Sequence, residues 1–242
     1  MHSVSVVIPA YNEAPNVGKA VADAVAAIEK ITSDYEIIVV DDGSRDGTAD
    51  VLKELMPRFP CLRVARNEPN RGYGGALRRG FEEAGKELIL FAPADNQFDL
   101  EETASLLALI EQGADIASGH RAERNDPLIR RLNAFGWNST IRVLFGFLSS
   151  DIDCGFKLFK RSILAHVPLY SNGAMIDTEL LAGAKARGYV IKDTPVTHLP
   201  RTAGKPTGAN LRVILRAFRD LFRFRLRLNA ELAQEKRQNG AK

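Results

Sequence analysis

The chain has 242 residues, of which 45% are hydrophobic and 26% charged, a composition typical of folded globular proteins. Its two cysteines, Cys61 and Cys154, make neither a metal-binding spacing nor a disulfide framework, and no apolar run approaches the ~20 residues of a membrane-spanning helix. The net charge of +3 is uneven, because residues 201–242 hold 11 Lys and Arg against 3 Asp and Glu. This basic segment indicates an anionic partner (a membrane surface, nucleic acid or phosphate) or a solvated charged helix.

Short β-branched runs alternate with helical patterns along the first 118 residues. Because strands that alternate with helices form parallel sheets, we expect a Rossmann-like α/β fold: a mostly parallel sheet with flanking helices. The predicted strands cover residues 4–8, 36–40, 62–65, 88–92 and 115–118, and the predicted helices cover 15–30, 46–56, a segment that opens at the glycine-rich loop 70–75, and 100–112.

The alternation ends after Gly119. Beyond it the pattern predicts a long helical segment over 128–148, a strand over 155–160, a helix over 177–187, a strand over 189–196 and a last helix over about 210–233. In the last helix an apolar stripe lies beside an arginine stripe, which is typical of a helix in a membrane interface but also of one docked on the sheet or on a second subunit. The apolar stripe holds Leu211, Ile214, Leu215, Phe218, Leu221, Phe222 and Leu226, and the basic stripe holds Arg212, Arg216, Arg219, Arg223 and Arg227.

Several familiar motifs fail on spacing. Residues 42–47 resemble the start of an EF-hand loop, but the twelfth position is Lys53 instead of glutamate, which excludes that calcium site. The glycines at 72, 74 and 75 lack the dinucleotide spacing and do not follow the first strand. The four histidines form no zinc pattern, and no serine lies in a nucleophile elbow. These absences argue against hydrolases, dehydrogenases and zinc enzymes.

Three polar turns follow the first, second and fourth predicted strands. Because the carboxyl ends of parallel strands meet at one edge, where such folds bind ligands, we expect the three turns to lie side by side. They read Pro9-x-Tyr11-Asn12-Glu13, Asp41-Asp42-Gly43-Ser44 and Ala94-Asp95-x-Gln97. In this order they resemble the nucleotide-sugar half of family 2 glycosyltransferases, which have the GT-A fold.

Later segments extend the resemblance to dolichol-phosphate mannosyltransferases and bacterial polyprenyl-phosphate glycosyltransferases. The matching segments are Ser118-Gly119-His120-Arg121, Asp151-x-x-x-Gly155-Phe156-Lys157, Asp177-Thr178-Glu179-Leu180-Leu181 and Arg201-x-x-Gly204-Lys205. The resemblance covers residues 4–208. It implies a GT-A catalytic domain over 1–208 and a basic amphipathic helical tail over 209–242.

The resemblance implies a nucleoside-diphosphate sugar as donor. Tyr11 would support the nucleobase, unless it serves only in packing, and Asp41 or Asp42 would accept hydrogen bonds from the base or the ribose. The implied donor-binding residues are Pro9, Tyr11, Glu13, Val40, Asp41, Asp42, Ala94 and Asp95.

A divalent cation, Mg²⁺ or Mn²⁺, is the implied cofactor, since it would neutralise the charge that builds on the leaving diphosphate. Asp95 and Gln97 are its expected ligands, with a turn-capping role for Asp95 as the alternative. The relatives have Asp-x-Asp-x-Gln at this place, whereas this chain has Pro93 where the first Asp belongs. We therefore expect a weakened metal site.

Basic residues after Gly119 match family positions that contact phosphates. An acceptor phosphate is an anion that must be held beside the sugar, and it needs no strong general base. The implied acceptor-phosphate residues are Arg121, Arg130, Arg131, Lys157, Arg201 and Lys205, and the implied catalytic residues are Asp95, Arg121, Lys157, Arg201 and Lys205. For a hydroxyl acceptor, Asp177 or Glu179 would be the base, and their alternative role is at a helix N-terminus.

The expected function is transfer of a hexose, with inversion, from a nucleoside-diphosphate sugar to a polyprenyl phosphate such as dolichyl or undecaprenyl phosphate. The alternatives are a hydroxyl acceptor and, because of Pro93, a non-catalytic module that binds nucleotide sugars. Since residues 1–3 lead straight into a strand, we expect a cytoplasmic protein, peripheral on the inner face of the membrane through its basic helix. The aromatic-rich segment 128–148 is a second candidate for lipid contact. Nucleic acid is not an expected partner, and the oligomeric state stays open.

Overall fold

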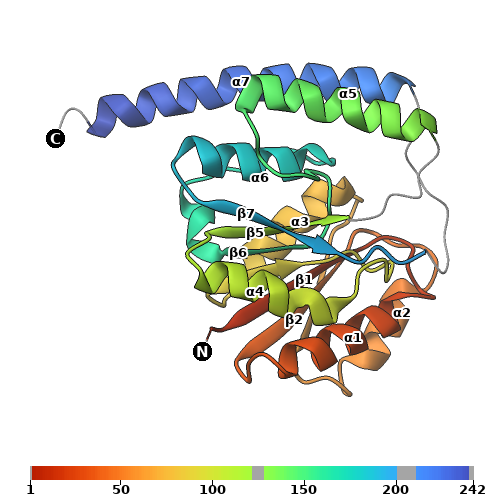
Figure 1. Ribbon diagram of the computed structural model, residues 1–242. Coiled ribbons are helices and arrows are strands. Elements are labelled where there is room, and N and C mark those ends of the chain that lie inside the picture. The colour runs from red at the N-terminus through yellow and green to blue at the C-terminus, as the bar shows by residue number, and fades with distance from the viewer. Residues whose placement is uncertain (1, 122–127, 201–210, 240–242) are drawn as a thin grey trace.

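The computed structural model describes residues 2–121, 128–200 and 211–239, with the side chains of 128–135, 211–217 and 239 outside the description. Its centre is a seven-stranded sheet with the strand order β3-β2-β1-β4-β6-β5-β7 (Figure 1). The strands are β1 (Val4–Ala10), β2 (Tyr35–Asp41), β3 (Leu62–Arg66), β4 (Leu88–Phe91), β5 (Ile116–Arg121), β6 (Lys157–Lys160) and β7 (Ile191–Val196). The helices are α1 (Val17–Glu29), α2 (Thr48–Leu55), α3 (Gly72–Glu83), α4 (Thr103–Glu111), α5 (Leu128–Phe145), α6 (Met175–Ala186) and α7 (Leu211–Asn239), with 3₁₀ turns at Leu100–Glu102 and Arg161–Ala165.

The sheet is mostly parallel, as the sequence predicts. β1 lies between β2 and β4 and runs parallel to both, with Pro9 opposite Val40 and Val7 opposite Phe91. β6 alone among the described strands runs against its neighbours β4 and β5. The carboxyl ends of β1, β2 and β4 therefore share one edge of the sheet.

Both faces of the sheet are buried, because each strand alternates its side chains between two cores. In β1, Val6 and Ile8 face the core under α1, α2 and α4, whereas Val7 faces the core under α3 and α6. In β4, Leu90 and Phe91 divide in the same way. Each such fully buried side chain contributes about 1.5–3 kcal/mol to folding, so the edge that carries the three turns rests on a rigid scaffold.

Helices α5 and α7 lie side by side in a further layer, on the side of α6 away from the sheet (Figure 1). The Trp137 and Phe218 rings pack edge to face with their centres 5.3 Å apart, and the centres of the Phe145 and Phe224 rings are 5.5 Å apart. The predicted segment 128–148 is helical as far as Phe145, where Gly146 at φ 75° ends the helix in the left-handed conformation that glycine adopts most easily.

The apolar stripe of the last helix divides between two environments. Leu221 is fully buried against the body, together with Phe224 and Leu228, which were not assigned to the stripe. Phe222 and Leu226 are 52% and 71% exposed. Side chains of Leu211, Ile214, Leu215, Arg212 and Arg216 lie outside the described residues. Among the described helices, none has both the length and the apolar composition that a bilayer crossing requires.

Candidate active site

A cavity of about 770 Å³ opens at the carboxyl edge of β1, β2 and β4. The three turns that the sequence singled out all contribute to its wall, as expected from parallel strands that end together. Its lining consists of Pro9, Ala10, Tyr11, Asn12, Glu13, Asp42, Asn70, Gly72, Tyr73, Ala76, Pro93, Ala94 and Asp95. Of the implied donor-binding residues, Val40 and Asp41 are fully buried and are not part of this lining.

Hydrogen bonds fasten the turn after β1 to the turn after β2. The Asn12 amide donates to Ser44 Oγ at 2.9 Å, and Asn12 Oδ1 accepts from the Arg45 amide at 2.9 Å. The Glu13 amide donates to Thr48 Oγ1, also at 2.9 Å. Tyr11 precedes Asn12 in the same turn and is half exposed. Its ring is therefore accessible to a ligand and not fully used in packing.

The two adjacent carboxylates at the carboxyl end of β2, Asp41 and Asp42, have different roles. Asp41 accepts hydrogen bonds from the Ser44 amide at 2.9 Å and from Arg66 Nη1 at 3.1 Å, and so shapes the turn from within. Asp42 lines the cavity and accepts from the amides of Arg71 and Gly72, at 3.0 and 2.8 Å. Asp42 is therefore the carboxylate that joins the cavity to the glycine-rich loop.

Asp95 lines the cavity beside Pro93, and its Oδ1 accepts from the Gln97 amide at 3.2 Å, so it also caps the turn. The Gln97 side chain donates to the Leu199 carbonyl at 3.3 Å and does not line the cavity. The described residues contain no group of three or more His, Cys, Asp or Glu able to hold a metal ion. A single hard carboxylate still suits Mg²⁺ or Mn²⁺, because such ions commonly complete their shell with phosphate oxygens and water. The residues thus fit a divalent cation held mainly by its ligand.

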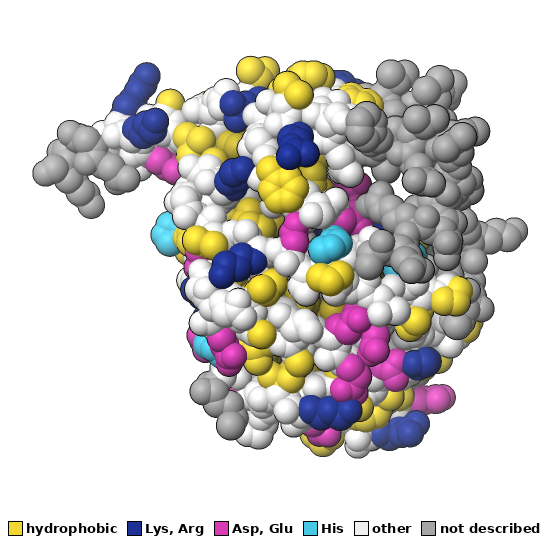
Figure 2. Space-filling view, in the orientation of Figure 1, with side chains coloured by type: hydrophobic (Ala, Val, Ile, Leu, Met, Phe, Trp, Pro, Cys, Tyr) yellow, Lys and Arg dark blue, Asp and Glu magenta, His cyan; other side chains and the backbone are white. Residues whose placement is uncertain are grey.

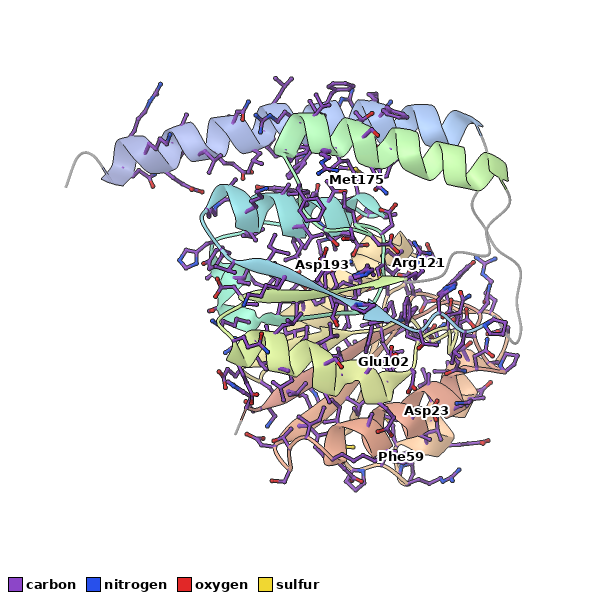
Figure 3. The ribbon with its side chains drawn as sticks, viewed as in Figure 1. Asp23, Phe59, Glu102, Arg121, Met175 and Asp193 are labelled. Atoms are coloured by element: carbon purple, nitrogen blue, oxygen red, sulfur yellow. The ribbon has the colours of Figure 1, made fainter. Side chains whose placement is uncertain are left out.

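Arg121 lies at the carboxyl end of β5 (Figure 3). Its guanidinium forms a two-pronged ion pair with Asp151, Nε to Oδ2 at 2.6 Å and Nη2 to Oδ1 at 3.0 Å. The Asp151 loop is held from the other side, where Asp193 of β7 accepts from the Ser150 amide at 2.7 Å. The Arg121 side chain is one-fifth exposed. The edge of its guanidinium that does not contact Asp151 is therefore the part that could bind an anion.

The structure places Lys157 differently from the expected phosphate contact. Its ammonium is completely buried and bonds Asp177 Oδ1 at 2.6 Å, the Ile152 carbonyl at 3.1 Å and the Cys154 carbonyl. It also lies 5.3 Å from the centre of the Phe91 ring. Because its buried ammonium has three protein acceptors, Lys157 holds a loop in position instead of facing a ligand.

The two candidate bases for a hydroxyl acceptor are also engaged inside the protein. Burial raises the pKa of Asp177, although the charge of Lys157 opposes that shift. Burial likewise raises the pKa of Glu179, whose carboxylate accepts from the amides of Tyr170 and Ser171, both at 2.8 Å. Both carboxylates are only 3% exposed and neither lines the cavity.

Sequence reasoning missed the wall that the glycine-rich loop contributes. Asn70, Gly72 and Tyr73 line the cavity, and a Cβ on Gly74 would lie 2.4 Å from the Ser171 carbonyl oxygen. The sequence pattern predicts that this loop begins a helix and excludes a dinucleotide motif, but it does not predict a wall of the cavity. Its position after β3, next to β2, was the signal that it would reach the same edge of the sheet.

Asp153 is another residue that the motifs did not reveal. The residue is exposed at the surface, but it is surrounded by protein atoms that reduce the hydration of its carboxylate. This desolvation is the largest cause that raises its pKa to about 6, and the charges of Asp177 and Asp151 add to it. The remaining implied phosphate contacts are Arg130, Arg131, Arg201 and Lys205. Arg201 and Lys205 lie outside the described residues, and so do the side chains of Arg130 and Arg131.

The fold and the cavity define an α/β protein of the GT-A type, in agreement with solved structures. Glucosyl-3-phosphoglycerate synthase from Mycobacterium tuberculosis, solved with Mn²⁺, UDP and glucosyl-3-phosphoglycerate, superposes with a TM-score of 0.68 at 18% identity over 96% of this chain and 79% of its own. Mannosyl-3-phosphoglycerate synthase from Rubrobacter xylanophilus gives 0.62 at 21% identity over 100% and 76%. These likenesses confirm the expected fold.

The family follows from the sequence. The model of "Glycosyl transferase family 2" matches residues 5–167, and the chain belongs to this family. It is 32% identical to an undecaprenyl-phosphate 4-deoxy-4-formamido-L-arabinose transferase of Pseudomonas fluorescens (strain Pf0-1), over 88% of this chain and 62% of the relative. It is 34% identical to the dolichyl-phosphate beta-glucosyltransferase of Saccharomyces cerevisiae, over 80% and 66%. The chain thus spans less than two thirds of either relative's length.

Proposed function

We propose that this protein transfers a sugar, with inversion at C1, from a nucleoside diphosphate to a polyprenyl phosphate. Residues 1–208 would form the catalytic unit and 209–242 its basic helical appendage. The observation that carries the proposal is the cavity at the carboxyl edge of the sheet, where Asp42 and Asp95 stand on opposite turns in a family 2 chain. The polyprenyl phosphate acceptor is supported by the names of the relatives, which are an undecaprenyl-phosphate transferase and a dolichyl-phosphate glucosyltransferase.

The donor half follows from the geometry of the turns. The exposed Tyr11 ring would stack on the nucleobase, and Asp42 would receive hydrogen bonds from base or ribose while keeping its own bonds to the glycine-rich loop. Asp95 would hold a divalent cation, which supplies charge neutralisation for the leaving diphosphate. The side-chain oxygen of Gln97 would not be a primary ligand, because Gln97 does not line the cavity.

The acceptor half rests on charge. An oxygen of the acceptor phosphate would attack C1 while the bond from C1 to the diphosphate oxygen breaks, so no proton has to be removed. The burial of Asp177 and Glu179 favours this acceptor over a hydroxyl, since neither carboxylate is free to accept a proton in the cavity. Arg121 would orient the phosphate, and Arg130, Arg131, Arg201 and Lys205 remain proposed contacts.

A transfer assay tests this function. The protein is incubated with radiolabelled UDP- and GDP-sugars, including glucose, mannose and aminoarabinose derivatives, and with undecaprenyl phosphate or free undecaprenol, with and without Mn²⁺. Labelled lipid that forms only from the phosphate is the expected result. Label on undecaprenol would support the hydroxyl-acceptor function, and nucleotide binding without transfer or donor hydrolysis would support a non-catalytic module and refute the proposal.

We also propose that the outer surface of α5 and α7 lies on the cytoplasmic face of a membrane, where a polyprenyl acceptor would be found. Val143 of α5 and Phe147, two residues beyond its end, are 85% and 51% exposed, and Phe222 and Leu226 of α7 are also exposed. Figure 2 shows hydrophobic side chains interspersed with Lys and Arg over these two helices. Apolar side chains among cations are what an anionic bilayer interface binds.

Vesicle co-sedimentation tests the membrane surface. Replacing Phe222 and Leu226 by serine is expected to reduce binding to vesicles of phosphatidylglycerol and phosphatidylcholine at least about tenfold, because two apolar anchors are lost. Met56→Ser is the matched control, since Met56 is 43% exposed at the C-terminal end of α2, which lies on the side of the sheet away from α7 (Figure 1). Equal binding of the double variant and the control would show that the surface does not face lipid.

A further inference from the structure

A second groove of about 680 Å³ lies beneath α7, next to the donor cavity. Its walls are the glycine-rich loop at the start of α3, residues 170–173, the N-terminal end of α6 at Met175 (Figure 3), and one side of α7. Asn70 and Gly72 line both hollows, so the two share one wall. Nothing in the proposed transfer reaction uses this groove.

Three arginines from two distant segments face the groove: Arg71 of the glycine-rich loop, and Arg223 and Arg227 of α7. Within the part of the chain that the structure describes, none of them has a carboxylate partner. Some other arginines are neutralised locally, as Arg187 is by Glu231 and Glu235. The groove is thus a place where three guanidinium groups converge that form no ion pair with a described carboxylate.

The groove wall also holds two acidic residues, Glu179 and Asp220, so its three arginines exceed its carboxylates by one. The Glu179 carboxylate accepts from the amides of Tyr170 and Ser171 and also interacts with the charge of Arg227. Asp220 is paired with its neighbour Arg219 at 3.1 Å. Because Asp220 is shared with Arg219, which is not part of the lining, the described lining keeps an excess of positive charge.

Fixed contacts hold Arg227 and part of the groove wall. The Arg227 guanidinium lies 4.2 Å from the centre of the Tyr170 ring, and Tyr170 Oη donates to Glu231 at 3.1 Å. On the opposite wall the Gly74 amide donates to the Asn172 carbonyl at 3.0 Å. A groove that is already formed loses little conformational entropy on binding, which favours a ligand.

We propose that this groove binds the phosphate group of a ligand other than the sugar donor. Guanidinium groups present parallel N–H donors that match two phosphate oxygens, and three of them provide the charge that a phosphate monoester or diester carries. The same chemistry is offered by a soluble phosphate ester and by the headgroup of an anionic lipid under α7. The site stands whether or not the transfer reaction is correct.

Two titrations of the full chain test the site. In the first, inorganic phosphate is added while backbone amides are followed by ¹H–¹⁵N correlation spectra, with and without saturating UDP or GDP. In the second, vesicles of phosphatidylglycerol in phosphatidylcholine are compared with pure phosphatidylcholine. The variants are Arg71→Gln and Arg223→Gln, which do not disturb the Tyr170 stack, and the charge-matched control is Arg237→Gln at the exposed end of α7.

Phosphate is expected to shift the amides of Tyr170 and Gly173 in the presence of nucleotide, and each groove variant is expected to weaken binding about tenfold while the control does not. Selective loss of vesicle binding in the groove variants, without a response to inorganic phosphate, would identify the lipid headgroup as the source. Displacement of phosphate by nucleotide would place it in the donor cavity and overturn the proposal. Identical behaviour of groove and control variants in both titrations would also overturn it.

Discussion

Replacing Lys157 by methionine is expected to destabilise the folded protein by about 3–5 kcal/mol, the cost of removing one partner from a buried ion pair. The Lys157 ammonium has three acceptors: Asp177 Oδ1, and the carbonyls of Ile152 and Cys154. Methionine fills nearly the same volume, so little packing is lost, but a carboxylate and two carbonyls lose their donor. Because burial raises the pKa of Asp177, the variant relieves part of the cost by taking up a proton. The loss should therefore lie near 3 kcal/mol.

Urea unfolding at pH 7.5, followed by far-ultraviolet circular dichroism, measures this difference. Lys53→Met is the control, because Lys53 is exposed on α2, and it should change stability by less than about 0.5 kcal/mol. The double variant Lys157→Met/Asp177→Leu should recover much of the loss, since it leaves no unpaired charge. A loss below about 1 kcal/mol in Lys157→Met, together with weaker binding of the acceptor phosphate, would refute the structural role and restore the phosphate contact.

Three further predictions concern the site. Asp153→Asn should stabilise the protein by on the order of 1 kcal/mol at pH 8 and not at pH 4. The raised pKa of Asp153 means that its ionisation between pH ~4 and 6 is opposed in the folded state, and solvent exposure reduces the full effect. Thermal unfolding at pH 4 and pH 8 measures the difference, and a difference that does not depend on pH would contradict the prediction. Gly74→Ala should cost about 1–3 kcal/mol and weaken nucleotide binding, because its Cβ would meet the Ser171 carbonyl, whereas Gly136→Ala, which meets nothing within 4 Å, should be neutral or stabilising in urea unfolding. Equal effects of the two glycine variants would show that the close approach is unimportant. Asp95→Ala should abolish the increase in transfer caused by Mn²⁺. It should also weaken the affinity for Mn²⁺ in the presence of nucleotide at least about tenfold, as measured by paramagnetic resonance titrations. Unchanged metal affinity would remove Asp95 from the metal site.

The order of strands and helices could be derived from the sequence because it depends on local periodicity. Runs such as Ile37-Ile38-Val39-Val40 are apolar on both faces, as strands buried between two layers of helices must be. The polar turns after β1, β2 and β4 were predicted to meet because parallel strands share an edge. The reversal of β6 was not predicted, since no local pattern distinguishes a parallel strand from an antiparallel one of four residues.

The charges after Gly119 show where sequence reasoning fails. Lys157 and Asp177 are twenty residues apart, and only the packing of β6 against α6 brings them together in the interior. The motifs gave both residues a possible contact with substrate, because residue type records a charge but not its partner. Arg121 likewise meets Asp151 only once β5 and the loop before β6 are assembled.

By itself, the sequence determined the fold class, the family resemblance and the edge of the sheet that carries the cavity, because these depend on residue periodicity and on the residues that follow each strand. Tertiary structure alone decided that Asp42, and not Asp41, faces the cavity, that the glycine-rich loop forms its wall, and that α7 buries Leu221 while it exposes Phe222. The physical reason is that burial and charge pairing are set by contacts between segments far apart in the chain. Such contacts leave no pattern in either segment when it is considered separately.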